Sequence, residues 1–279
     1  MPSAATAADI ERVVAGLRSF VDGDRATFAV IGLGPRAVPA LRALLFEREP
    51  SGLYQPRCRA ARALAALRAF DVLAAFLRRE TAIPDAVERL GEEAVINAAA
   101  EGLSHLREGW VFDLLLAVAR RHPSGALANA IGSFRRAEAI PVLVEHLIED
   151  EARPAAETAL LALGPAARPA LLRAARTAVP SAPEESPSSR RRRGSALKLL
   201  AEIGVTREEW RALAPLVDDP DATIALRTCV VGLTLGDSPA IWRRLSTLLR
   251  AADHADAARI CALLSAPVAK GEWGGDASP

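Results

Sequence analysis

Lysine, aromatic residues and cysteine are all scarce in this chain of 279 residues. Aromatic residues make up only 4% of it, and strand-favouring residues are sparse beside Ala and Leu, which excludes a strand-rich core on composition. The three cysteines, Cys58, Cys229 and Cys261, lie far apart and form no Cys-x-x-Cys pair. Their spacing excludes a disulfide framework and a zinc cluster, and we expect reduced thiols in the core.

Long apolar runs and a strong excess of one charge are also missing. No run approaches the roughly 18 apolar residues that a membrane span needs, so no membrane partner is predicted. Residues 1–9 lack a basic region followed by an apolar core; we therefore predict no signal peptide and expect a cytoplasmic protein. The 35 basic and 34 acidic residues argue against a strongly basic nucleic-acid binder.

Arginine supplies nearly all of the positive charge, since Lys198 and Lys270 are the only lysines. Two explanations stay open: a GC-rich bacterial genome, or a surface that needs bidentate contacts to carboxylate or phosphate. Hydrophobic residues make up 51% of the chain. This is enough for a continuous core built from helix-forming Ala and Leu, in one or two domains.

Internal repeats are the main feature that is present. The segment Leu-Gly-Pro-Arg-Ala-Val-Pro-Ala-Leu at residues 33–41 recurs as Leu-Gly-Pro-Ala-Ala-Arg-Pro-Ala-Leu at 163–171, with looser copies at 136–143 and 235–241. Gly commonly follows the last residue of a helix, and Pro commonly lies in the first turn of the next helix. Each copy therefore predicts a turn between two helices.

A second pattern, Arg-x-x-Ala-x-x-(Ala/Leu)-Leu, lies upstream of these turns at residues 57–64, 153–160 and 193–200. Its small residues share one helical stripe, which lets the helix approach its neighbour closely. The last residue of the pattern aligns successive units at spacings of 34, 39, 28, 29, 40 and 32 residues, which suit two helices and two turns. The aligned residues are Val30, Leu64, Leu103, Ile131, Leu160, Leu200 and Gly232.

These repeats resemble HEAT repeats, most closely the bacterial subclass of the phycobilisome (PBS) lyases. The resemblance implies an all-α fold, an α-solenoid with a right-handed superhelix of about seven HEAT-like hairpins over residues 1–266, stacked because one hairpin cannot bury its apolar face alone. It also implies that Arg-opened helices lie on the concave side and Pro-opened helices on the convex side. The expected concave helices are 23–32, 57–67, 92–106, 124–134, 151–162, 190–203 and 221–235. The expected convex helices are 35–47, 70–79, 109–121, 137–149, 165–177, 206–217 and 238–251, with a last helix near 254–265.

Two segments depart from the repeat. Residues 179–189 are rich in Pro and Ser, so we predict a mobile surface insertion there. Residues 267–279 contain few core residues beyond Val268 and Trp273, and we predict a flexible C-terminal tail.

Several short motifs suggest chemistry when taken alone. Residues 32–37 match Gly-x-Gly-x-x-(Gly/Ala), but they lie in repeat phase and lack the acid that a dinucleotide site has about 20 residues on. Ser195 and Lys198 match Ser-x-x-Lys without its companion motifs. Trp110 and Asp113 lie one turn apart, and helical-repeat DNA glycosylases also use an Asp with aromatic side chains, but here the pair falls on a predicted convex helix. The four histidines are scattered, so no metal site is predicted.

We therefore predict a protein that is not an enzyme, has no cofactor or metal, and serves as a scaffold or adaptor binding another protein along its concave face. Two alternatives stay open: a nucleic-acid-binding helical-repeat protein, and a bilin lyase-like chaperone of cofactor attachment. The run Arg190–Arg193 opposes the dipole of its helix, so it is either a solvated helix end or a contact patch. The candidate partner-binding residues are Arg57, Arg62, Asn97, Glu101, Asn129, Glu157, Arg190, Arg191, Arg192, Arg193, Lys198 and Arg227.

Overall fold

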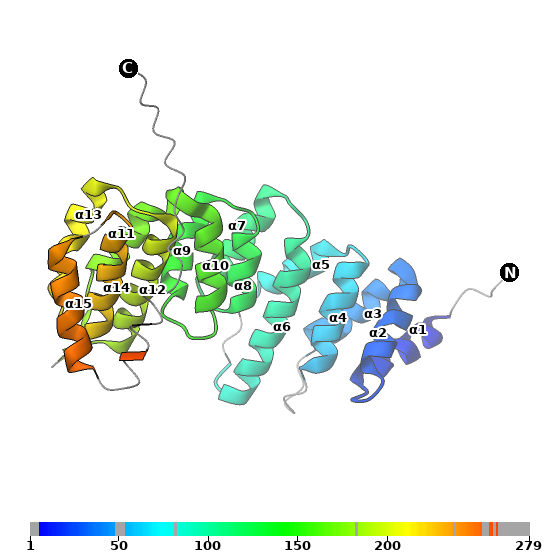
Figure 1. The fold of residues 1–279 in the computed structure, drawn as a ribbon. Helices are drawn as coiled ribbons and strands as arrows, with labels where there is room; N and C mark the ends of the chain where they lie inside the picture. Colours follow the sequence, from blue (N-terminus) through cyan, green and yellow to red (C-terminus); the bar gives the residue numbers. More distant parts are fainter. Residues whose placement is uncertain are drawn as a thin grey trace, which may run out of the picture. The chain divides into compact units, whose positions relative to one another are not determined.

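The computed structural model describes residues 6–47, 54–80, 83–181, 184–236, 238–252, 257–258 and 261. Within these residues the fold is all-α, apart from a two-residue pairing of β1 (Pro180–Ser181) with β2 (Glu184–Glu185) (Figure 1). The chain divides into two compact units, residues 1–134 and residues 135–279, which are described separately. No helix of the described residues is both long and apolar enough to cross a membrane.

Unit 1 (residues 1–134) consists of two layers of helices that alternate along the chain. Neighbouring even-numbered helices pack side by side in one layer, and neighbouring odd-numbered helices pack in the other. The even-numbered helices are α2 (Gly23–Gly32), α4 (Gln55–Ala66), α6 (Ala86–Ser104) and α8 (Gly125–Gly132). The odd-numbered helices are α1 (Ala7–Ala15), α3 (Val38–Phe46), α5 (Phe70–Leu77) and α7 (Gly109–Ala119), with 3-10 turns η1 (Gly16–Arg18) and η2 (Gly34–Ala37).

Unit 2 (residues 135–279) repeats the same arrangement. Its even-numbered helices are α10 (Arg153–Leu163), α12 (Pro187–Ile203) and α14 (Ala222–Leu233). Its odd-numbered helices are α9 (Ile140–His146), α11 (Arg168–Arg176), α13 (Arg207–Leu213) and α15 (Pro239–Ala251), with 3-10 turns η3 (Ala137–Ala139), η4 (Gly164–Ala167) and η5 (Ala214–Asp218). Helix α12 packs against both α10 and α14, so one layer continues through the unit.

Hairpin turns are marked by residues with positive φ. Among the described residues these are Gly34, Arg68, Arg135, Gly164, Gly204 and Gly236. Each lies four residues after an aligned residue of the repeat, for example Gly34 after Val30 and Gly236 after Gly232. The left-handed conformation ends one helix and redirects the chain into the next, so the repeat has the same turn geometry wherever this residue occurs.

The predicted helices correspond closely to the observed ones, and the differences lie at a few ends. Helix α1 was not predicted, although Thr6 and Asp9 form a complete capping box at its start. Helix α6 begins at Ala86 rather than near 92, and α12 begins at Pro187, inside the predicted insertion 179–189. The predicted tail 267–279 lies outside the described residues, and so does most of the predicted last helix. A single repeat domain over residues 1–266 stays a prediction.

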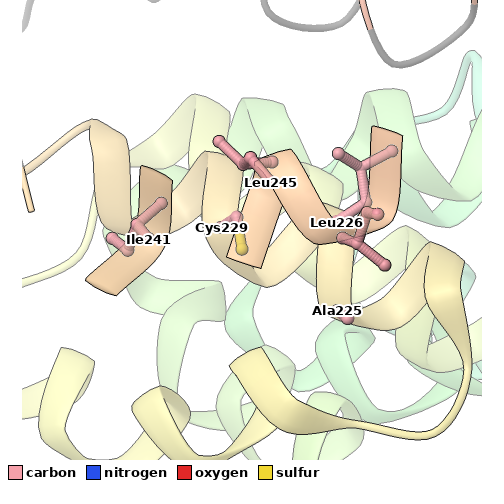
Figure 2. Packing of buried hydrophobic residues seen from close by; sticks show 6 residues of the cluster. Ala225, Leu226, Cys229, Ile241 and Leu245 are labelled. Atoms are coloured by element: carbon pink, nitrogen blue, oxygen red, sulfur yellow. The ribbon is translucent and has the colours of Figure 1, made fainter. Parts of the chain in front are cut away.

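Close helix packing uses the small residues of the repeat. In α4, Ala60, Ala63 and Leu64 have no exposed surface, as the stripe of the second pattern predicts. In unit 2 the corresponding core cluster joins α14 to α15 through Ala225, Leu226, Cys229, Ile241, Leu245 and Leu248 (Figure 2).

Gly232 takes the place that larger apolar residues fill in the other repeats. A Cβ atom at this position would come within 2.7 Å of the Trp210 ring and closer still to Ile241 Cδ1. The indole of Trp210, which packs against the α14–α15 cluster, thus fills the volume of the missing side chain. This explains how glycine can stand at the aligned position of this repeat.

Candidate functional site

The candidate partner-binding residues fall into two groups, buried and accessible. Arg57 and Arg193 are 6% and 3% exposed, whereas most of the other candidates lie at least partly on the surface. Because a partner cannot reach a buried guanidinium, the two groups have different roles.

Arg57 joins four helices of unit 1. Its Nε donates to the carbonyl oxygen of Leu45 near the end of α3 at 2.9 Å, and its Nη1 pairs with Glu92 Oε2 of α6 at 2.5 Å. The guanidinium also lies over the ring of Phe76 in α5, 5.6 Å from its centroid. The arginine therefore satisfies a helix-end carbonyl and links one repeat to the next.

Arg193 makes the equivalent contacts in unit 2. Its Nε donates to the carbonyl oxygen of Ala175 near the end of α11 at 2.9 Å, Nη1 pairs with Glu185 Oε2 at 2.5 Å, and Nη2 pairs with Asp219. Burial favours the neutral form, but Asp219 and Glu185 outweigh it and raise the pKa of Arg193. Arg57 and Arg193 thus hold their own units together, and we leave both out of the candidate surface.

The arginine run at the start of α12 is split by the helix. Arg192 turns toward the odd-numbered layer, where Nη1 lies 3.5 Å from Glu145 Oε1 and Nη2 lies 3.5 Å from the carbonyl oxygen of Thr177. Arg190 and Arg191 lie instead toward α10 and α14. All four arginines contact their own unit, but only Arg190 and Arg191 also line the surface on the side of α10 and α14.

In unit 1 the accessible candidates lie on the even-numbered layer. Arg62 and Glu101 both line a shallow hollow of about 540 Å³ between α4 and α6. The Asn97 side-chain oxygen accepts a hydrogen bond from Ser124 Oγ at 2.7 Å, which links α6 to the start of α8. Asn129 is exposed on α8. These residues form a mixed polar surface, and the hollow is lined by two arginines, Arg62 and Arg68, and one carboxylate, Glu101.

The remaining candidates of unit 2 meet in one groove of about 580 Å³ on three successive even-numbered helices. Its charged lining, from α10, α12 and α14, is Arg153, Glu157, Arg190, Arg191, Lys198, Asp221 and Arg227. We call this surface the basic groove, because five cationic side chains face two carboxylates. The sequence predicted five of these seven residues; Arg153 and Asp221 were not among them.

Two of the cations in the basic groove are paired with its two carboxylates. Lys198 Nζ lies 2.6 Å from Glu157 Oε2, and Arg190 Nη1 lies 3.7 Å from Asp221 Oδ2. Asp221 also caps α14 by accepting from the amides of Thr223 and Ile224. The other three cations have no carboxylate of the groove lining as partner; Arg153 and Arg191 share Asp150 at its edge.

Arg227 lies in the basic groove without an ion-pair partner among the described residues. Its Nη1 donates to the carbonyl oxygen of Gly194 at 3.2 Å, while its buried Nε has no hydrogen-bond partner in the described part of the chain. Desolvation lowers the pKa of Arg227, aided by Arg153 and opposed by Glu157. A desolvated guanidinium of this kind is stabilised by an incoming anion.

A second cavity, of about 460 Å³, lies in unit 1 between the end of α5, the start of α6 and the end of α7. Its lining includes Phe76, Ile83 and Ile96, three arginines (Arg79, Arg89, Arg121) and three glutamates (Glu80, Glu92, Glu93). Glu80 is paired with Arg121 and Glu92 with Arg57. Burial first, and then Arg121, lowers the pKa of His122 at this cavity, which keeps its imidazole neutral near pH 7.

The short motifs with chemical associations are all placed on helices. Residues 23–32 form α2, so the Gly-x-Gly-x-x-Ala segment follows a helix and not the strand that a dinucleotide site needs. Lys198 of the Ser-x-x-Lys pair forms an ion pair with Glu157 of α10. Trp110 of α7 donates to Glu108 and stacks on Arg78, whose guanidinium lies 5.7 Å from a ring centroid.

The comparisons with known proteins find similar solved structures, and one of them is a bacterial protein complex. The chain is similar to a chain in the complex of CpcE and CpcF of phycocyanin lyase from Nostoc sp. PCC7120, over 90% of this chain and 97% of that chain, with 22% sequence identity and a TM-score of 0.37. No protein-family model and no curated protein matches. By its alternating helices, the chain is an all-α repeat protein that resembles the PBS-lyase-type HEAT-like proteins, as its repeats predict.

Proposed function

We propose that this protein is a non-catalytic scaffold or adaptor that binds another protein through its even-numbered helices. The basic groove carries the proposal. Side chains from three successive helices converge there, and its cations exceed its carboxylates by three. Surfaces of this kind, made of parallel helices in a repeat protein, offer many anchoring points to one extended partner.

The test is capture of a partner by the full chain, followed by mapping of the bound surface. We expect hydrogen exchange in the complex to slow in α10, α12 and α14, and binding to weaken for the double variant Arg190→Glu/Arg191→Glu. The matched control is Arg207→Glu/Arg211→Glu on exposed positions of α13, which makes the same change in net charge on the odd-numbered layer. Loss of binding in both variants, or in neither, would remove the groove from the proposal.

A bilin lyase-like role in cofactor attachment is the second candidate. It is supported by the resemblance of the repeats, by the similarity to the phycocyanin lyase complex, and by the 460 Å³ cavity of unit 1. The apolar walls and arginines of that cavity suit an apolar ligand with carboxylate groups, because two of its glutamates are already paired. Co-expression with a phycocyanin subunit and a bilin supply tests it: a coloured covalent adduct that forms only with this chain supports the role, and a colourless subunit rejects it.

A further inference from the structure

We infer that the basic groove recognises an acidic segment of a polypeptide, one rich in Asp and Glu. This inference deepens the proposed function and rests on it. It assigns a chemical class to the partner, which neither the resemblance nor the compared structure supplies.

Arg227 is the first argument for an anionic ligand. It contributes a desolvated guanidinium whose Nε lacks a partner and which has no carboxylate of its own among the described residues. The other two cations, Arg153 and Arg191, share a single carboxylate, that of Asp150 at the edge of the groove, which lies 2.7 Å from Arg153 Nη1 and 4.0 Å from Arg191 Nη1. A carboxylate entering the groove gains charge-assisted hydrogen bonds that the unbound protein does not make at Arg227.

Ser195 adds a neutral donor at the same place. The residue lines the basic groove and is 6% exposed. It lies one helical turn from Lys198 on α12. A hydroxyl can donate to a carboxylate oxygen, so Ser195 supplements the cations at the floor of the groove.

The carboxylates of the groove decide between a polypeptide and a nucleic acid. Glu157 and Asp221 stand among the cations, and a nucleic-acid strand would carry a regular row of phosphates past both of them. A polypeptide can place carboxylates opposite Arg191 and Arg227 and neutral donors opposite Glu157 and Asp221. Packed helices are about 8–10 Å apart, so three helices span too short a track for the many phosphate contacts that give nucleic-acid affinity.

Fluorescence anisotropy of labelled peptides with the full chain tests the inference. The acidic probe is a peptide of alternating glutamate and glycine, and the matched neutral probe has glutamine in place of glutamate. We expect the acidic probe to bind more tightly, with affinity that falls as salt screens the charges. Arg190→Glu/Arg191→Glu should weaken binding by about tenfold or more, and Arg227→Gln by about tenfold. Arg207→Glu/Arg211→Glu should change it little.

Three outcomes would overturn the inference, and they separate it from the proposed function. Equal binding of the acidic and neutral probes leaves polypeptide binding in place but removes the acidic specificity. Tighter binding of a labelled single-stranded DNA, lost in Arg190→Glu/Arg191→Glu, assigns the groove to nucleic acid. The third outcome is that neither peptide binds, while the chain still captures a partner that protects α10, α12 and α14 from exchange. This would show that the groove recognises a partner by a feature other than acidic side chains. Circular dichroism melts of every variant establish that each is folded.

Discussion

Arg57 shows how one side chain can link several helices. It is the partner of Glu92, with side chains 8% and 11% exposed. We predict that Arg57→Ala lowers the free energy of unfolding by about 3–5 kcal/mol, because Glu92 is left buried without its counter-charge. Arg62→Ala, on the exposed side of the same helix, should change it by less than about 0.5 kcal/mol. Urea denaturation measures both, and similar values for the two variants would contradict the assigned role.

Alanine substitutions at Gly232 and Gly32 are expected to change the stability of the protein in opposite directions. Gly232→Ala places a methyl group against Trp210 and Ile241, and we predict a loss of about 1–3 kcal/mol from overpacking. Gly32→Ala meets nothing within 4 Å at the end of α2, so we predict a gain of about 0.4–1 kcal/mol from the reduced entropy of the unfolded chain. If the denaturation midpoints of the two variants shifted in the same direction, this would contradict the close contact of Gly232 with Trp210 and Ile241.

Arg68 occupies a turn position that glycine fills in other repeats, with φ of 59°. Replacing it by Gly removes the steric cost of the left-handed conformation, which is roughly 1 kcal/mol, so Arg68→Gly should raise the melting temperature. Arg120, the exposed C-cap residue that follows α7, with φ of −64°, is the control with the same change in side chain. Arg120→Gly should lower the melting temperature, since it gains only flexibility.

The sequence predicted the positions of the arginines but not their environments. Arg57 and Arg193 are the first residues of the second pattern, a position where an arginine side chain could equally well be exposed to solvent. Their burial depends on acids 35 and 26 residues away, Glu92 and Asp219, which share no common spacing. Five of the seven charged residues of the basic groove were predicted, because polar residues of a repeat helix are expected on the face away from its apolar stripe.

Helix boundaries followed the repeat wherever local signals agreed with it. Helix α6 begins earlier than predicted, after Asp85, whose side chain accepts from the Glu88 amide and caps the helix. The Tyr54 ring then packs beside Gly91, where a Cβ would come within 3.1 Å of it. Glycine in the middle of a helix is a weak signal by itself. Helix α1 had a readable signal in Thr6 and Asp9, but no copy of the repeat pattern pointed to it.

Two cysteines on even-numbered helices test whether the core is accessible to a reagent in the native protein. Cys58 of α4 and Cys229 of α14 are buried, and desolvation raises both pKa values, that of Cys229 to about 11. Because the thiolate is the reactive form, we predict that iodoacetamide modifies exposed Cys261 in the native protein and reaches the other two only after unfolding. Peptide mass spectrometry measures each site. Rapid native labelling of Cys229 would show that α14 and α15 separate readily.

At the scale of the whole molecule, the two compact units suggest that damage in one stays local. In a repeat array each hairpin contacts mainly its neighbours. We predict that Gly232→Ala speeds hydrogen exchange in α13, α14 and α15 and leaves exchange in α2 and α4 unchanged. Uniformly faster exchange along the chain would instead show that the protein opens as one cooperative body.

The constant distance from an aligned residue to its turn has a practical consequence. That distance is four residues at each positive-φ turn, whereas the units themselves range from 28 residues (Leu103 to Ile131) to 40 residues (Leu160 to Leu200). Length has therefore varied before the aligned residue, in the connections between hairpins and in their first helices, such as α6 with 19 residues and α8 with 8, while the step from the aligned residue to its turn stayed fixed. An insertion after α11, such as a tag, a fluorophore-binding loop or a second recognition peptide, should leave every hairpin in register. The same insertion beside Gly164 should disrupt the register of its hairpin.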